Sequence, residues 1–411
     1  MTNSVASCRV LVSRASLVLL GVICCLAVHG VECGRLKYVR RPAVEVETVF
    51  DVMQHGAKAD GETDDATAFI QAWKAACESS GPAKVLIKGE FMVGEVVFTG
   101  PCPQPITIEI QGNITASSDP SSYSHGAWIM VQHAENVEVT GGGTINAHGK
   151  DFWGFSGGDT SVLPVSFVFQ AVSNCKLHDL NFVDSMGFHT KVTDSHDVAV
   201  HNLKITAPET SPNTDGLHLS NATNIDITDS VIGTGDDCIS IGEGSKNVTV
   251  TGITCGPGHG ISIGSLGKRP DELDVAWITV KNCTLTGTTN GARIKTFHDS
   301  PELSASGIIY QDIVMNQVKN PIIIDQHYSS KNKPTQSSVK ISDVHFLNIK
   351  GTTTSEIPVN LDCSTKFPCE NIELADIDLA PVGSISLKSA CASAKTLLKG
   401  VQNPPGPSSC V

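Results

Sequence analysis

The sequence is poor in charged and in aromatic residues. Asp, Glu, Lys and Arg make up 17% of the chain and Phe, Trp and Tyr only 5%, whereas about a quarter of the residues in a typical domain are charged. Much of the folded surface is therefore expected to be neutral and polar. Glycine is abundant, at 37 residues, and with many Thr, Ser, Val and Ile it favours short strands and tight turns over helices.

An excess of basic residues is also lacking. The chain has 29 Lys and Arg against 42 Asp and Glu, which gives a net charge of −13. Nucleic acid is therefore excluded as a partner, because a polyanion is repelled by this bulk charge. An anionic substrate would need a local group of basic side chains.

No apolar run is long enough for a clear membrane span. Residues 17–28 are apolar, two arginines precede them and small residues follow. This pattern is typical of a secretory signal peptide cut after Gly30 or Cys33, with an uncleaved signal anchor as the alternative. We assign residues 1–33 to a signal peptide, whose loss changes the net charge from −13 to −14. A secreted protein without membrane contact is expected.

The cysteines show no Cys-x-x-Cys spacing, so nothing indicates a zinc site. Ten of the fourteen follow residue 33, and secretion favours disulfides. Spacing favours Cys363–Cys369 and Cys391–Cys410, then Cys77–Cys102 and Cys238–Cys255, with Cys175 and Cys283 left over. Glycosylation sequons at Asn113, Asn221, Asn247 and Asn282 agree with a secretory route.

Short alternating segments recur after about residue 105. Each starts with a turn residue, and successive segments lie 23 to 38 residues apart. They are residues 136–139, 174–177, 197–200, 224–227, 247–250, 277–280, 307–310, 338–341 and 371–374. Such a period with several short strands in it signals a solenoid. We predict an all-β fold, a single-domain right-handed parallel β-helix; a β-sandwich explains the period less well.

One helix is expected before the repeats. Ala68, Phe69 and Trp73 fall near helical spacing within residues 62–78, with Thr63 as the candidate N-cap. This helix would cover the open end of the β-helix, since an uncovered sheet edge invites aggregation. The expected division is a signal peptide (1–33), a lead segment (34–47), the β-helix (48–400) and a C-terminal tail with a disulfide (401–411).

A second strand family brings acidic residues onto adjacent coils. Its rows begin at Asp215, Asp237, His259 and Ala292, which are 22, 22 and 33 residues apart. Neighbouring strands lie about 4.8 Å apart, so Asp215, Asp237 and His259 would form a column about 10 Å long. A single aspartate is more often a turn residue, but motifs in register over successive coils indicate a site.

Strand alternation predicts which side chains leave the interior. Leu217, Ile239, Ile261 and Ile294 would point inward. The outward positions would hold Gly216, Cys238, Gly260, His218, Ser240, Ser262, Asp236, Arg293 and Lys295. Strict alternation turns Asp215 and Asp237 inward. Both stand at strand starts, where a turn can break the pattern, so we place them at the edge of an outward groove.

This set of side chains fits glycoside hydrolysis. One carboxylic acid protonates the leaving oxygen, while a carboxylate activates water or attacks directly. Three aspartates within reach repel one another, so at least one should keep its proton to higher pH. Arg293 and Lys295 can pair with a substrate carboxylate.

Four motifs resemble the signature of the polygalacturonase family of glycoside hydrolases, which degrade pectin. They are Asn-Thr-Asp at 213–215, Gly-Asp-Asp at 235–237, Gly-His-Gly at 258–260 and Arg-Ile-Lys at 293–295. The resemblance covers roughly residues 48–400, and the wider sequence looks most like plant pollen-type exopolygalacturonases. It implies hydrolysis of α-1,4-galacturonosyl bonds from the non-reducing end of polygalacturonate, by an inverting mechanism without a metal or other cofactor.

The resemblance also implies a role for each residue. Asp236 would be the general acid, and Asp215 and Asp237 would activate the water. His259 would tune the acid or hold its proton network. The substrate-binding residues would be Arg293, Lys295, Tyr328 and Asn213. The protein would act on pectin in the cell wall, as a monomer.

Two segments bear on the exo character. Exo action needs a cleft closed at one end, and residues 151–163 and 208–212 are candidates for closing it. Many plant members have a cysteine directly after the cleft tyrosine, but this chain has Ser329, so no disulfide is expected in the loop that follows.

Other functions remain as alternatives. An endo-acting enzyme would share the same site. A calcium-dependent lyase is disfavoured by the Gly-His-Gly and Arg-Ile-Lys motifs, and a rhamnogalacturonan hydrolase by the Arg-Ile-Lys motif alone. A non-catalytic pectin-binding protein is disfavoured because all three carboxylates are present.

Overall fold

The computed structural model describes residues 47–154, 163–329, 336–407 and 410, which belong to one compact unit. The expected signal peptide, nearly all of the lead segment and the loop after Ser329 lie outside these residues, as does most of the segment 151–163. Within the described ranges, no helix is both long enough and apolar enough to cross a membrane.

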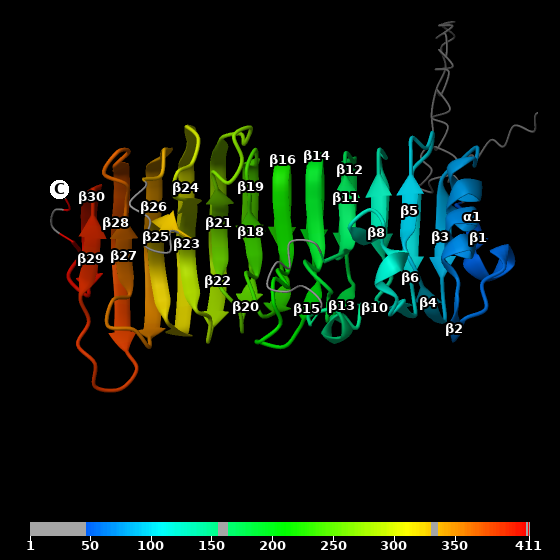
Figure 1. Ribbon diagram of the computed structural model, residues 1–411, viewed down its shortest axis with the longest axis horizontal. Helices are drawn as coiled ribbons and strands as arrows, with labels where there is room; N and C mark the ends of the chain where they lie inside the picture. The colour runs from blue at the N-terminus through cyan, green and yellow to red at the C-terminus, as the bar shows by residue number, and fades with distance from the viewer. Residues whose placement is uncertain (1–46, 155–162, 330–335, 408–409, 411) are drawn as a thin grey trace, which may run out of the picture. The chain divides into compact units, whose positions relative to one another are not determined.

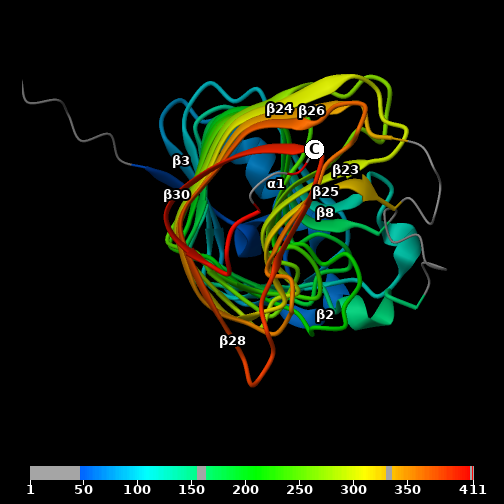
Figure 2. The ribbon, with the colours of Figure 1, turned by 90° about the vertical axis from the view of Figure 1, so that its left-hand side faces the viewer.

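The described residues form a right-handed parallel β-helix of 30 strands, which confirms the predicted fold (Figures 1 and 2). The chain coils from the N-terminal end to the C-terminal end, and strands pair in parallel with strands of the preceding and following coils. Three ladders of paired strands result, which we call the site ladder, the long ladder and the short ladder.

The site ladder consists of β5 (Val96–Thr99), β8 (Ala127–Gln132), β11 (Val165–Gln170), the first halves of β14 (Thr190–His201) and β16 (Leu217–Thr228), β18 (Ile239–Ile241), β21 (Ile261–Leu266), β23 (Asn290–Phe297), β25 (Asn320–Tyr328), β27 (Val359–Asp362) and β29 (Ser389–Ala392).

The long ladder consists of β1 (Thr48–Asp51), β3 (Ala83–Ile87), β6 (Ile106–Ile110), β9 (Val137–Thr140), β12 (Ser173–His178), the second halves of β14 and β16, β19 (Lys246–Thr251), β22 (Val275–Thr286), β24 (Leu303–Val318), β26 (Val339–Thr353), β28 (Cys369–Pro381) and β30 (Ala394–Asn403).

The short ladder consists of β2 (Asp60–Asp64), β4 (Glu90–Val93), β7 (Asn113–Ala116), β10 (Thr144–Asn146), β13 (Asn181–Val183), β15 (Lys204–Thr206), β17 (Val231–Gly233) and β20 (Thr254–Cys255), which pairs with the end of β22. In the described ranges, three short 3₁₀ helices lie between strands: η1 (Val52–His55), η2 (Pro120–Ser122) and η3 (Gly149–Asp151).

The single α-helix of the described residues, α1 (Ala66–Cys77), lies at the N-terminal end of the coil (Figure 1). It buries Phe69 against Phe91, with ring centroids 5.2 Å apart, and Trp73 against Phe98 at 5.1 Å. The predicted start at residue 62 and the Thr63 cap are wrong, because residues 60–64 form β2. The Thr63 hydroxyl donates to the Asp60 carboxylate at 2.7 Å instead.

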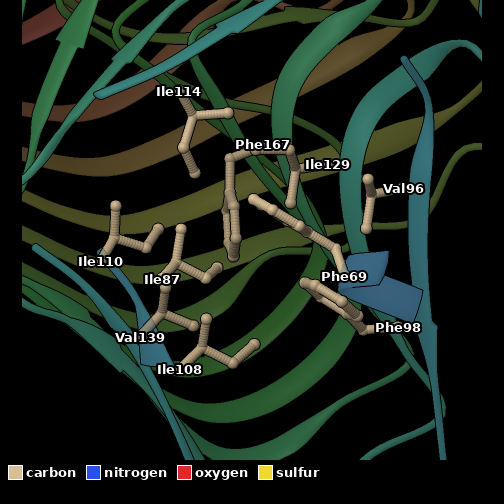
Figure 3. Close-up of a pocket in the computed structure, with 10 residues that line it drawn as sticks. All are labelled: Phe69, Ile87, Val96, Phe98, Ile108, Ile110, Ile114, Ile129, Val139 and Phe167. Carbon is tan, nitrogen blue, oxygen red and sulfur yellow. The ribbon is translucent and has the colours of Figure 1, made fainter. Parts of the chain in front are cut away.

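The interior is a continuous apolar core. Figure 3 shows its N-terminal part, where isoleucine, valine and phenylalanine side chains from successive coils converge beside Phe69 of α1. The cavity left between them is about 10 Å³, so the coils are closely packed here. At the C-terminal end, β30 continues to Asn403, within the segment expected as the tail.

Residues with positive φ form the corner at which each coil turns from the site ladder to the long ladder. Asn224 and Asn247, at φ 58° and 54°, stack so that the Asn247 amide donates to Asn224 at 2.8 Å. Most of the predicted segment starts occupy this corner, but Ser338 does not. Asp343, at φ 56°, takes that place, and Val344 pairs with Ile308. Both stretches of β26 alternate, so the sequence pattern could not separate them.

All four expected disulfides are present, and Cys175 and Cys283 are free and buried. Cys391–Cys410 ties the C-terminal tail to β29, and Cys238–Cys255 joins the turn directly before β18 to β20. All four sequon asparagines are exposed.

Candidate active site

A cleft of about 530 Å³ lies beside the middle of the site ladder. Seven of the eight predicted site residues line it, and the eighth, Asp237, is 1% exposed and contacts Lys295, which lines it. The seven are Asn213, Asp215, Asp236, His259, Arg293, Lys295 and Tyr328. In contrast, residues 208–212, expected to close one end, are absent from the described lining.

The predicted acidic column is confirmed by the backbone register. Leu217, Ile239 and Ile261 pair in succession, so Asp215, Asp237 and His259, two residues earlier in each row, stand in line. Glycines permit the tight approach of the turns before these strands. A Cβ on Gly235 would lie 2.0 Å from the Ser211 carbonyl oxygen, and one on Gly260, at φ 88°, would lie 2.2 Å from that of Asn290.

Two details of the predicted alignment are wrong. Cys238 is not outward but fully buried, in its disulfide with Cys255. It lies in the turn before β18, where strand alternation does not yet apply. The row of the fourth coil is shifted by two residues, because Ala292 pairs with Ile261 and Arg293 with Ser262. An even shift preserves the side-chain face, so Arg293 and Lys295 still face the site.

Asp236 and His259 form a close pair. The His259 Nδ1 donates to Asp236 Oδ1 at 2.8 Å, and the Asp237 backbone N–H donates to the same oxygen at 2.8 Å. Burial alone would raise the pKa of Asp236, but the hydrogen bond and charge of His259, followed by Lys295, lower it overall. The pKa of His259 is raised, chiefly by that hydrogen bond and against the effect of burial. The pair therefore favours His259 protonated and Asp236 ionised.

Asp215 has the opposite electrostatics. Burial raises the pKa of this carboxyl group well above its usual range, and the charges of Asp236 and Asp237 add to the effect. The Ser240 hydroxyl donates to Asp215 Oδ2 at 2.6 Å. Ser240 in turn lies 2.8 Å from His218 Nδ1, so the histidine donates to the serine oxygen and orients its hydroxyl.

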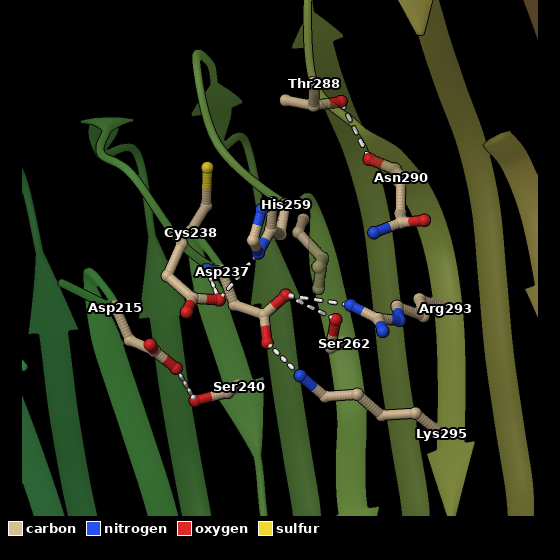
Figure 4. Close-up of polar contacts among 12 residues, drawn as sticks. Asp215, Asp237, Cys238, Ser240, His259, Ser262, Thr288, Asn290, Arg293 and Lys295 are labelled. Atoms are coloured by element: carbon tan, nitrogen blue, oxygen red, sulfur yellow. Dashed lines mark hydrogen bonds and ion pairs between the residues drawn. The ribbon is translucent and has the colours of Figure 1, made fainter. Parts of the chain in front are cut away.

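Asp237 sits in a network of donors (Figure 4). Its Oδ2 accepts from Lys295 Nζ at 2.7 Å, and its Oδ1 accepts from the Ser262 hydroxyl at 2.7 Å. Arg293 Nη1 lies 3.9 Å from Oδ1. Burial lowers the pKa of Lys295, but the Asp237 charge outweighs it and the pKa is raised overall. The lysine is therefore charged at neutral pH.

Arg293 and Lys295 form a cationic wall of the cleft, and both lie against the ring of Tyr328. The Arg293 guanidinium and the Lys295 ammonium each lie 5.4 Å from the centroid of the Tyr328 ring, within cation–π range. The Arg293 side chain is 12% exposed, and its buried Nε has no hydrogen-bond partner among the described residues. A planar guanidinium with unused donors is suited to a carboxylate.

The sequence interpretation missed four residues that support the aspartates. It treated Ser240 and Ser262 only as small groove residues, although their hydroxyls bind Asp215 and Asp237. His218 was expected only at an outward position of its strand, without a role. His189 gave no signal; it is fully buried, with Nδ1 3.2 Å from the Asp215 carbonyl oxygen, and burial lowers its pKa to about 4. Their polar positions were visible in the sequence, but their hydrogen bonds depend on cross-coil register.

The arrangement can carry out acid–base chemistry on an anionic substrate. Three carboxylates share one site in different surroundings, so their proton affinities are driven apart. One carboxylate oxygen each of Asp236 and Asp237 and one ring nitrogen of His259 all lie within 4.8 Å of one another. Arg293 provides local positive charge at the cleft, although the net charge of the chain is −13.

Comparison with known proteins agrees with this chemistry. Residues 77–400 match the family described as glycosyl hydrolases family 28. An exopolygalacturonase of Arabidopsis thaliana is 43% identical over 341 residues, which cover 82% of this chain and 80% of the relative. A polygalacturonase of Gossypium barbadense is 42% identical over 377 residues, or 90% of this chain and 93% of the relative.

Solved structures agree on the fold. An exopolygalacturonase from Thermotoga maritima superposes with a TM-score of 0.74 at 17% identity, covering 86% of this chain and 91% of that one. An endo-xylogalacturonan hydrolase from Aspergillus tubingensis gives 0.75 at 24% identity, covering 86% and 100%.

Proposed function

This chain belongs to family 28 of the glycosyl hydrolases, and we propose that it hydrolyses α-1,4-galacturonosyl bonds of polygalacturonate from the non-reducing end. The observation that carries the proposal is the cleft itself, where an acidic cluster lies beside Arg293, a nearly buried cation with unused hydrogen-bond donors. The names of the plant relatives support both the substrate and, through several exopolygalacturonases, the exo direction.

Binding begins with the charge of the substrate. Arg293 receives the galacturonate carboxylate, and Tyr328 holds the guanidinium from the other side. Lys295 contributes mainly through Asp237, to which it is already bonded at 2.7 Å. Asn213, which lines the cleft at φ 50°, offers its amide to the sugar hydroxyls.

Asp236 then acts as the general acid. The carboxylates and His259 hold a proton in common, which rests away from Asp236 in the free site because the pKa of Asp215 is raised and that of Asp236 lowered. A substrate carboxylate at Arg293 adds negative charge and raises the proton affinity of Asp236. Protonation of Asp236 removes its repulsion of Asp215, which can then ionise.

The ionised Asp215, together with Asp237, activates the water. The second oxygen of Asp215 is free for this task, since only Oδ2 receives the Ser240 hydroxyl. Water adds to the anomeric carbon as Asp236 gives its proton to the leaving oxygen, so the configuration inverts in one displacement. The proton that the water loses passes to Asp215, which returns the free site to its starting state, and His259 stays protonated beside Asp236 throughout. No metal or cofactor is assigned to any step.

A second assignment of roles follows from the same electrostatics. The raised pKa of Asp215 would make it the acid if the substrate leaves the proton in place, with Asp236 as the base. A galacturonosyl fluoride distinguishes the two, because fluoride leaves without protonation. We expect Asp236→Asn to lose polygalacturonate hydrolysis by about 10²–10⁴-fold and to keep fluoride hydrolysis. Retained fluoride hydrolysis in Asp215→Asn instead would reverse the roles.

The exo direction has its own test. Defined oligogalacturonates should yield galacturonate alone at early times, whereas mixed oligomers would establish endo action. A protein that binds polygalacturonate but releases no reducing ends at mildly acidic pH would be a non-catalytic binder. We further propose that the chain is secreted to the cell wall, which a signal-cleaved N-terminus on the extracellular protein would test.

A further inference from the structure

A second cavity, of about 400 Å³, continues the cleft along the site ladder. The two spaces share Phe188, Ser265 and Lys268, so they adjoin each other. The second cavity also contains Lys191 of β14 and Arg269 of the turn after β21. The proposed hydrolysis assigns no step to a residue of this second cavity, although His218, which orients Ser240, also lines it.

The acidic side chains of this cavity are already engaged. Glu272 accepts from the backbone N–H groups of Gly267, Lys268 and Arg269, the last two at 3.0 Å. Glu243 pairs with the Arg269 guanidinium at 2.8 Å. Asp194, which is exposed, accepts from the Asn221 amide at 2.8 Å. These acids are therefore bonded to other groups, and Asp194 and Glu243 act on Lys191 only through their charge, with no ion pair or hydrogen bond among the described residues.

Lys191 and Lys268 are the unpaired charges. Neither ammonium has a carboxylate within 4.0 Å in the described part of the chain, nor any hydrogen bond from its Nζ there. Lys191 is partly buried, and this burial lowers its pKa. A partly desolvated ammonium gains strongly from an anionic partner, because its own hydration has already been reduced. The cavity is thus suited to a carboxylate.

The register places Lys191 and Arg293 symmetrically about Ser240, while Lys268 lies in the turn after β21. Lys191, His218, Ser240, Ser262 and Arg293 pair in succession across five strands. Ser240, which binds Asp215, lies two strands from each cation, or about 10 Å at the usual strand spacing. A polymer lying across the strands would therefore meet positive charge on both sides of the acids.

We propose that Lys191 and Lys268 form a second carboxylate-binding site, which holds a further uronate unit of a chain that has another carboxylate at Arg293. This inference rests on the proposed function. Phe188, between the two cavities and 4.9 Å from the His218 ring, offers an apolar face to the sugar ring between the sites. The strands that carry Lys191 and Arg293 are four strand spacings apart, about 19 Å between backbones, a distance that a longer oligomer spans and a dimer does not.

The test compares chain lengths in variants that lack these charges. Lys191→Met, Lys268→Met and the double variant keep the apolar stems, and Lys204→Met on the short ladder is the matched control. For the double variant, KM for tetragalacturonate should rise by about tenfold, the effect of one charged contact. Digalacturonate kinetics should not change. Lys268 is exposed, so Lys268→Met should fold normally, and its KM for tetragalacturonate still tests the site even if Lys191→Met folds poorly.

Binding is measured separately from catalysis. In an Asp236→Asn background, calorimetry should show the same tenfold weaker affinity for tetragalacturonate, and no such loss for its fully methyl-esterified form. Equal tetragalacturonate affinity with and without the lysines overturns the second site, whatever the activity. If the unsubstituted protein cleaves neither length, the proposed function fails on its own account, while the binding comparison still decides the site.

Discussion

Replacing Lys295 by methionine would leave a buried aspartate without its main counter-charge. The Lys295–Asp237 pair is 2.7 Å long, and its side chains are 9% and 1% exposed. Methionine keeps most of the apolar stem, so the change removes chiefly the charge and its hydrogen bond. Asp237 would retain the Ser262 hydroxyl and the more distant Arg293.

The magnitude follows from burial. Breaking a buried ion pair at one end typically costs about 3–5 kcal/mol, since the remaining charge stays desolvated. Because Ser262 and Arg293 still compensate Asp237 in part, we expect the lower end, about 3 kcal/mol of unfolding free energy. The pKa of Lys295 is raised, so the contribution is present in full below the ordinary value of 10.5 and is lost as the pH rises through the folded-state pKa.

The assay is urea unfolding at neutral pH with two comparisons. Lys395→Met removes a surface pair with Glu370, whose side chains are 72% and 45% exposed, and should cost less than about 1 kcal/mol. The double variant Lys295→Met with Asp237→Asn should recover most of the loss, because no buried charge remains. A double variant as unstable as Lys295→Met alone would refute the reasoning. So would a Lys295→Met variant that loses no more unfolding free energy than Lys395→Met.

Three further predictions concern the surroundings of the aspartates. His259→Gln should lower kcat and displace the basic limb of the pH–rate profile, since the raised pKa of His259 keeps it protonated above its ordinary 6.5; an unchanged profile would remove His259 from the proton network. Ser240→Ala removes a hydrogen bond that lowers the pKa of Asp215, so the acidic limb should move to higher pH, and a shift to lower pH would contradict this. Joint replacement of Cys238 and Cys255 by alanine opens a loop of 17 residues and should cost about 3 kcal/mol in unfolding experiments, whereas Cys283→Ala, which breaks no disulfide, serves as the control.

The fold was predictable because its signal is periodic. Turn residues such as Asn224 and Asn247 recur once per coil, at positive φ, and bind each other across coils. The same periodicity misled where two alternating stretches share one strand, as in β26, and where a loop changes the row length, as before Arg293. Thr63 resembled a helix cap, but it lies within β2, a strand of the first coil.

The residues of the cleft were also predictable, because four motifs place them in register. Their electrostatics were not. Mutual repulsion requires one aspartate to keep its proton, yet only the burial of Asp215 and the bond from His259 to Asp236 decide which one. Hydroxyl donors such as Ser262 escape sequence patterns, since their importance comes from a partner 25 residues away on the neighbouring coil.

The most direct test follows the anomeric proton signals during hydrolysis of trigalacturonate by nuclear magnetic resonance, with a chelator present. The account predicts that galacturonate appears first as its β-anomer and only later equilibrates, because a single displacement inverts the α-linkage. An α-anomer formed first would contradict the inverting mechanism. An unsaturated sugar product, or no new reducing end, would contradict hydrolysis by Asp215, Asp236 and Asp237 altogether.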